Sequence, residues 1–184
     1  IIPNSYLMWW NSPVKNILSR FADQRDKFWD GKRAAKATAM NLTPVQVYTM
    51  ASIVEEETNK QEDKGLIASV YMNRIKKGMK LEADPTVKYA MRNFSLKRIL
   101  HGHLQYPSPY NTYQNTGLPP GPISTASINT IDAVLDAPLT DYIFFVAKPD
   151  FKGYSNFAST YQQHLIYARA YQRALDSLIL SRNK

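Results

Sequence analysis

The segment Thr43-Pro44-Val45-Gln46 is a strong helix-start signal and constrains what the middle of this chain can fold into. Thr43 can cap the helix, proline suits its first position, and a glutamine three residues after the cap completes a capping box. The following run, Val45–Lys60, contains good helix formers and no breaker, so we predict a helix over it. The helical pattern continues over Gln61–Lys76 and is expected to stop at Gly78.

Apolar spacing and turn residues predict the remaining elements. An extended segment over 1–10 precedes a helix capped by Ser12 that is expected to reach Asp30. Further helices are expected at 32–40, 86–91, 96–100, 127–136 and 160–182, and residues 101–123 are expected to form a long loop. A β-branched and aromatic run predicts a strand at 142–147, with 151–157 as its hairpin partner. The predicted fold class is α+β, mostly helical, with a small β-hairpin.

Composition excludes several kinds of chemistry. The chain has 184 residues and no cysteine, which excludes disulfides, thiolate metal sites and cysteine nucleophiles. The sequence contains no stretch of about 20 apolar residues, so no membrane-spanning helix is predicted. The chain begins with Ile1 rather than methionine, and we expect it to be a fragment of something longer. His101 and His103 are expected to be surface histidines in a loop, so neither a metal nor a cofactor is predicted.

The net charge suggests an anionic partner. Lysines and arginines number 23 against 15 acids, a formal balance of +8. Such a surface suits nucleic acid, lipid headgroups or an anionic polymer. The basic residues are scattered, without an aromatic-interleaved stripe, so nucleic acid is not the predicted partner.

The acidic cluster Glu55-Glu56-Glu57 lies in the helix predicted at 45–60. Successive residues of a helix point about 100° apart, so at most two of these can face a cleft. Glu55 sits over small residues and Glu57 over apolar ones, so burial would raise the pKa of either and let it act as a proton donor. Helical geometry does not decide between them, whereas Glu56 is expected to be exposed. The alternative is a solvated acidic helix end.

Two further segments carry groups that could meet a sugar. Asp84 precedes a proline at a turn, where it is either a second carboxylate or the cap of the next helix. Asn111 and Tyr113 offer an amide and a phenol on the long loop. They suit hydrogen bonding and stacking with a sugar; the alternative is that the loop uses Asn111 and Thr112 to satisfy its own backbone.

Several motifs in order resemble the YceG-like endolytic murein transglycosylases. The resemblance runs over about residues 43–173, and the motifs that carry it are Ala51-Ser52-Ile53-Val54-Glu55-x-Glu57-Thr58, Ala68-Ser69-Val70-x-x-Asn73-Arg74, Asp84-Pro85-Thr86-Val87, Tyr110-Asn111-Thr112-Tyr113, Gly117-Leu118-Pro119-Pro120-Gly121-Pro122-Ile123 and Phe157-x-x-Thr160-x-x-x-His164. Several separate motifs in one order are more specific than any single one.

The resemblance implies a lysozyme-like catalytic domain over 43–184, with 1–42 as an N-terminal segment and helices packed on it. It places the catalytic glutamate on Glu55 and substrate contacts on Glu57, Asp84, Asn111 and Tyr113. It also implies peptidoglycan strands as substrate, the peptidoglycan synthesis machinery as partner, and the outer face of the bacterial cytoplasmic membrane as location. The membrane anchor of the family would precede this chain.

Two positions depart from the family pattern. Ser155-Asn156 stands where many members have a histidine before the final phenylalanine motif, and Glu56 stands where lysine is common. An added acid beside Glu55 would raise its pKa further.

The function implied is cleavage of the bond between N-acetylmuramic acid and N-acetylglucosamine, with closure to a 1,6-anhydro end. Glu55 would act first as acid and then as base. The alternatives are a muramidase that uses water and a glycan-binding module without activity. No lysine context supports pyridoxal-phosphate chemistry, which older labels attach to such sequences.

Overall fold

A computed structural model describes residues 1–29 and 31–182. Its helices and strands follow the order α1 (Val14–Phe28), α2 (Lys32–Ala39), α3 (Pro44–Glu57), α4 (Gln61–Lys76), α5 (Asp84–Ala90), α6 (His101–Leu104), α7 (Ile128–Leu135), β1 (Phe144–Ala147), β2 (Ser155–Ala158) and α8 (Tyr161–Arg182). The mostly helical α+β class with a small hairpin is confirmed.

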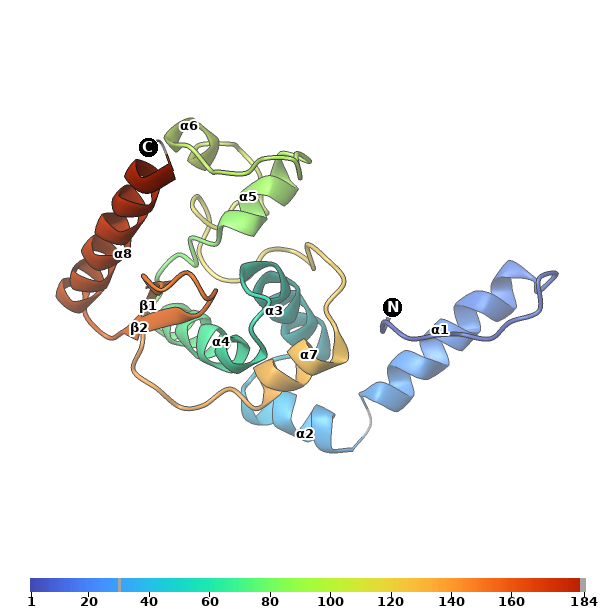
Figure 1. The fold of residues 1–184 in the computed structure, drawn as a ribbon. Coiled ribbons are helices and arrows are strands. Elements are labelled where there is room, and N and C mark those ends of the chain that lie inside the picture. Colours follow the sequence, from blue (N-terminus) through green and yellow to red (C-terminus); the bar gives the residue numbers. More distant parts are fainter. Residues whose placement is uncertain (30, 183–184) are drawn as a thin grey trace.

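Helix α3 is the centre of the body and packs against α2, α4, α5 and α7 (Figure 1). Its side chains from Val47 to Val54 are almost all buried. Burial of each large aliphatic side chain contributes about 1.5–3 kcal/mol, so this helix is the main source of core stability. The predicted capping box is present, because Thr43 Oγ1 accepts from Gln46 N at 3.2 Å and Gln46 Oε1 accepts from Thr43 N at 2.8 Å.

Helix α3 ends three residues earlier than predicted. Thr58 is extended, and its Oγ1 accepts a hydrogen bond from Lys60 N at 3.0 Å. The turn 58–60 separates α3 from α4, so Glu57 is the last helical residue. A run of good helix formers does not reveal such a stop, because a local side-chain bond to the backbone causes it.

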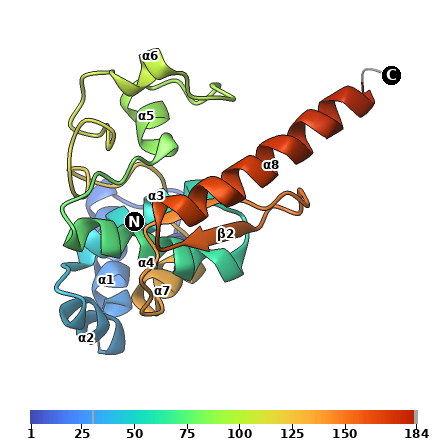
Figure 2. The same ribbon diagram turned by 90° about the vertical axis from the view of Figure 1, so that its left-hand side faces the viewer.

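The antiparallel hairpin of β1 and β2 pairs Phe145 with Phe157 and Ala147 with Ser155. The segment before β1 is fixed to α4: Asn73 Nδ2 donates to Thr140 O at 2.8 Å and Arg74 Nε donates to Ile143 O at 2.7 Å. Helix α8 packs along the hairpin and extends beyond it (Figure 2). The hairpin therefore lies against α4, beside the end of α3.

Two predicted helix features are wrong. Helix α1 begins at Val14 without a side-chain cap, and Ser12 N instead donates to Trp9 O at 3.0 Å. Residues 96–100 are not helical. The chain is extended at Leu100, and the short helix of this region, α6, begins only after it, at His101. The expected helix end at Asp30 lies outside the described residues.

The N-terminal region contacts the body mainly through Ile2, the C-terminal end of α1 and helix α2. Ile2 is buried in the core, whereas α1 buries none of its described residues and extends away from the body in Figure 1. Helix α2 packs on α3 and α7. None of the helices formed by the described residues is long and apolar enough to cross a membrane.

Candidate active site

The last turn of α3 separates its three acids. Glu56 is exposed, as predicted, while Glu55 and Glu57 are partly buried on different sides of the helix. Glu55 faces α4 and the start of α7. Glu57 contacts Tyr71 of α4, and the charge of Asp84 at the start of α5 acts on it.

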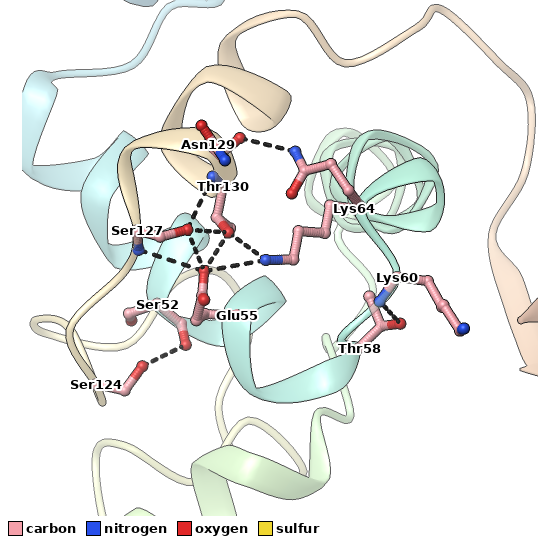
Figure 3. Close-up of polar contacts among 10 residues, drawn as sticks. Ser52, Glu55, Thr58, Lys60, Lys64, Ser124, Ser127, Asn129 and Thr130 are labelled. Carbon is pink, nitrogen blue, oxygen red and sulfur yellow. Dashed lines mark hydrogen bonds and ion pairs between the residues drawn. The ribbon is translucent and has the colours of Figure 1, made fainter. Parts of the chain in front are cut away.

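Glu55 is held by donors from two other helices (Figure 3). Its Oε2 lies 3.3 Å from Lys64 Nζ and accepts from Ser127 Oγ at 3.0 Å and Ser127 N at 3.3 Å. Thr130 Oγ1 also donates to Oε2, while it accepts from Lys64 Nζ at 2.6 Å. The Lys64 side chain is only 8% exposed, so this is a largely buried ion pair that joins α3, α4 and α7.

The predicted rise in the pKa of Glu55 is wrong. Burial acts to raise this pKa, but the hydrogen bonds from Thr130, Lys64 and Ser127 outweigh burial and hold the pKa below its usual value. Glu55 is therefore an ionised acceptor near neutral pH. The sequence pattern indicated burial but could not show donors that come from 72 and 75 residues away.

Glu57 has the environment that was expected for either glutamate, in which burial raises the pKa of the carboxyl group. Burial raises its pKa to about 7; the hydrogen bond from Tyr71 and the charge of Lys88 oppose this rise, and the charge of Asp84 adds to it. The Tyr71 hydroxyl donates to Glu57 Oε1 at 2.7 Å. Tyr71 itself is buried, and its ring packs edge-on against Phe145 of β1. Glu57 can therefore hold a proton close to neutral pH.

Asp84 and Tyr113 meet beside Glu57. Tyr113 Oη donates to Asp84 Oδ1 at 2.7 Å. Burial and this hydrogen bond to Asp84 raise the pKa of Tyr113, which keeps the phenol protonated. Asp84 is the first residue of α5 rather than its cap, which is Ala83, so the capping alternative is wrong.

Asn111 is fully buried and its side chain is used inside the loop. Its Nδ2 donates to Leu104 O at 3.0 Å and Tyr106 O at 2.8 Å, and its Oδ1 accepts from Tyr113 N at 3.0 Å. Direct contact of Asn111 with a sugar conflicts with this placement, because no free polar atom faces outward. Asn111 instead fixes the backbone that carries Tyr113.

Thr112 joins that loop to α5. Its backbone carbonyl accepts from Glu82 N, and its Oγ1 accepts from Ala83 N at 3.0 Å and lies 2.8 Å from Thr86 Oγ1. The interpretation of the loop as satisfying its own backbone included Thr112. Sequence reasoning gave no role in the site to Tyr71, Lys64, Ser127 or Thr130. The signals for these four were the apolar pattern of the helix predicted at 61–76, which includes Tyr71, and the helix start predicted at Ser127.

A pocket of about 440 Å³ opens at the turn after α3 and is lined by Glu56, Glu57, Thr58, Asn59, Lys60 and Gly153. A second pocket of similar size is lined by residues of the N-terminal segment and α1, and neither Glu55 nor Glu57 lines it. Within residues 1–29 and 31–182, no three His, Asp or Glu side chains are grouped closely enough to hold a metal ion.

Comparison with known proteins gives a consistent result. The YceG-like family matches residues 1–170. A Bacillus subtilis (strain 168) protein named endolytic murein transglycosylase is 42% identical over 139 residues, which is 76% of this chain and 36% of that protein. A Streptococcus pneumoniae protein of the same name is 38% identical over 111 residues, 58% of this chain and 20% of that protein. The chain thus spans about a third or less of these relatives.

A solved structure has the same fold. The crystal structure of a YceG-like protein from Listeria monocytogenes superposes with a TM-score of 0.76 at 33% identity, and the match covers 88% of this chain and 52% of that one.

Proposed function

Because the chain belongs to the YceG-like family, we propose that it is the catalytic part of an endolytic peptidoglycan transglycosylase. Its two named relatives are murein transglycosylases, which supports a glycan strand as substrate. The observation that carries the proposal is the placement of Glu57 at the end of α3, where it accepts from the Tyr71 hydroxyl beside the Asp84–Tyr113 pair and where burial raises its pKa to about 7.

Glu57 is the proposed acid and base. Protonated Glu57 donates its proton to the glycosidic oxygen between N-acetylmuramic acid and N-acetylglucosamine, and the bond from this oxygen to the anomeric carbon breaks. The 6-hydroxyl oxygen of the muramic acid then bonds to that carbon, and ionised Glu57 takes the hydroxyl proton. The product carries a 1,6-anhydro end, no water is consumed, and the enzyme returns to its starting protonation state.

The neighbours of Glu57 suit these two steps. A carboxyl group with a pKa near the working pH can both give and recover a proton. Tyr71 donates to the ionised form, which favours the state that acts as base. Tyr113 donates its single hydroxyl proton to Asp84, which fixes the orientation of its ring, so its phenol oxygen is left to accept a hydrogen bond from a sugar hydroxyl.

Glu55, which the motif resemblance marks as catalytic, is the alternative acid. The four hydrogen bonds that Glu55 accepts outweigh its burial and lower its pKa, which suits an ionised group that positions the end of α3. We therefore assign the chemistry to Glu57 and the support of the helix to Glu55.

The test is muropeptide analysis by mass spectrometry of glycan strands digested with wild type, Glu57→Gln, Glu55→Gln and the exposed control Glu56→Gln. Glu57→Gln should lose at least about 100-fold in rate, as removal of a general acid does. Folded Glu55→Gln should retain most of its activity, and Glu56→Gln should equal wild type. Loss of activity in folded Glu55→Gln with a normal rate in Glu57→Gln would return the acid role to Glu55.

The products also separate the other candidate functions. Products heavier by one water identify a muramidase, whereas binding of strands without any product identifies a glycan-binding module. Anhydro ends support the transglycosylase.

The location and domain division complete the proposal. We propose that the enzyme acts at the outer face of the bacterial cytoplasmic membrane, near the peptidoglycan synthesis machinery. The proposed murein substrate supports this location, and the excess of positive charge suits anionic lipids and wall polymers there. Residues 43–184 would form the catalytic domain, with 1–42 as its N-terminal extension.

A further inference from the structure

The loop 148–154 that joins β1 to β2 gathers positive charge beside the proposed acid. Lys60 Nζ lies 4.6 Å from the centre of the Tyr154 ring, and Lys148 Nζ lies 5.8 Å from it. Lys60 lines the same pocket as Glu57. Figure 3 shows the Lys60 side chain pointing away from the Glu55 network.

The loop is built to hold this position. Lys148 N donates to Tyr154 O at 2.8 Å, and the Phe151 ring packs on Tyr171 of α8. Ser155 N donates to the buried carboxylate of Asp63 at 2.7 Å, which fixes the end of the loop to the first turn of α4. Gly153 has φ +85°, and a Cβ there would lie 3.1 Å from Lys60 Cε, so the backbone passes directly over the lysine.

The ammonium groups of Lys60 and Lys148 form no ion pair with a carboxylate of the described residues. The nearby acids have other roles: Asp63 accepts from Ser155 N, and Asp150 accepts from Lys152 N. Glu56 and Glu57 line the pocket but do not pair with Lys60. An aromatic ring flanked by two unpaired cations is suited to a ligand that combines apolar surface with negative charge.

We propose that Lys60, Lys148 and Tyr154 form a subsite that binds a carboxylate of the glycan strand next to the scissile bond. This inference rests on the proposed function. Two groups of the substrate carry that chemistry: the stem peptide, and the lactyl group of muramic acid once the peptide is removed. The subsite makes the enzyme prefer anionic strands over neutral ones and adds no chemical step.

The test compares wild type with the double variant Lys60→Gln/Lys148→Gln on peptide-bearing strands, on strands stripped of peptide by an amidase, and on a neutral N-acetylglucosamine polymer. Lys152→Gln, an exposed change in the same loop, is the control. Each lysine removed should raise KM on peptide-bearing strands by about two- to fivefold, with kcat changed less than twofold, because a partly exposed ion pair contributes modestly. The difference should shrink as salt is added.

The stripped strands identify the source of the carboxylate. A KM difference on peptide-bearing strands that disappears on stripped strands assigns the stem peptide, whereas a difference found only on stripped strands, where the lactyl carboxylate is free, assigns the lactyl group. Equal KM values for wild type and the double variant on both kinds of strand would overturn the subsite, as would an equal loss of affinity for the neutral polymer.

Equilibrium binding in the Glu57→Gln background keeps this test separate from the proposed chemistry. If wild type yields no product, the proposed function fails, but weaker binding of anionic strands by the lysine variants still supports the subsite. Normal binding by those variants would disprove it.

Discussion

The hydroxyl of Tyr71 donates to Glu57 Oε1 at 2.7 Å, although the two residues lie 14 positions apart on different helices. Tyr71 is otherwise a core residue, with its ring against Phe145 of β1. One buried residue therefore couples the packing of the hairpin to the proton affinity of the proposed acid.

Replacement of Tyr71 by phenylalanine tests this coupling. The hydroxyl stabilises ionised Glu57, so its loss should raise the pKa of Glu57 above about 7. The alkaline limb of kcat/KM, where protonated Glu57 is lost, should move up by as much as about one pH unit, given the usual strength of one hydrogen bond. The measurement is a pH–rate profile with a thermal melt as fold control. An unchanged limb in a folded variant would disprove the coupling.

Glu55→Gln should destabilise the fold rather than the chemistry. It leaves the Lys64 ammonium, which is 8% exposed, without its carboxylate. Breaking a largely buried ion pair from one side should lower the free energy of unfolding by about 2–4 kcal/mol. Urea unfolding measures this loss, and Glu56→Gln is the matched control. A Glu55→Gln protein as stable as wild type would show that the pair contributes little.

Glu57→Gln should have the opposite effect on stability at alkaline pH. The pKa of Glu57 rises from 4.5 to about 7 on folding, so the folded state binds more protons between these values and wild-type stability falls as pH rises through this window. The variant lacks this pH dependence. The difference in unfolding free energy between variant and wild type should therefore shift in favour of the variant by up to about 3 kcal/mol from pH 4 to pH 8. Urea unfolding at both pH values measures the difference, and parallel pH dependences would argue against a raised pKa.

Asn111→Ala should reduce activity without touching substrate. The change removes hydrogen bonds to the carbonyls of Leu104 and Tyr106 and from the backbone N–H of Tyr113, although Leu104 O keeps its bond from Gln114 Nε2. The loss of these partly buried hydrogen bonds should cost about 1–3 kcal/mol of unfolding free energy, and kcat/KM should fall because Tyr113 is displaced. Tyr113→Phe is the companion variant: it should keep wild-type stability and lose activity. Full activity in a folded Asn111→Ala protein would show that the loop does not need this anchor.

The sequence predicted the helices well where a local signal defines them. The capping box at Thr43, the N-cap at Ser127 and the apolar stripe of α4 are all features of neighbouring residues, and each helix is confirmed. Predictions failed where the position of a helix start depends on the conformation of a single turn, as at Ser12 and at 96–100. There a short backbone contact outweighs residue preference.

The candidate site was predictable only in outline. The pattern predicted that Glu55, Glu57, Asp84 and Tyr113 are site residues, but it did not distinguish the environments of the two glutamates, and the expected rise in the pKa of Glu55 is wrong. Donors from α7 lower the pKa of Glu55, and Tyr71 meets Glu57 only when α4 packs on α3. These are long-range contacts. Helical periodicity predicts which face of a helix is buried, but it does not identify the side chains from other elements that pack on that face.

The early end of α3 has an electrostatic consequence. Carbonyl groups in the last turn of a helix carry partial negative charge, because their dipoles align along the axis and no further amide N–H donates to them. A carboxylate at the final position meets that charge and is made less stable, so the proton on Glu57 is retained more readily. If the helix continued to Lys60, Glu57 would lie one turn inside it, where further amide groups donate to the nearby carbonyl groups. The partial negative charge near Glu57 would then be smaller, and this contribution to keeping its carboxyl group protonated at neutral pH would be lost.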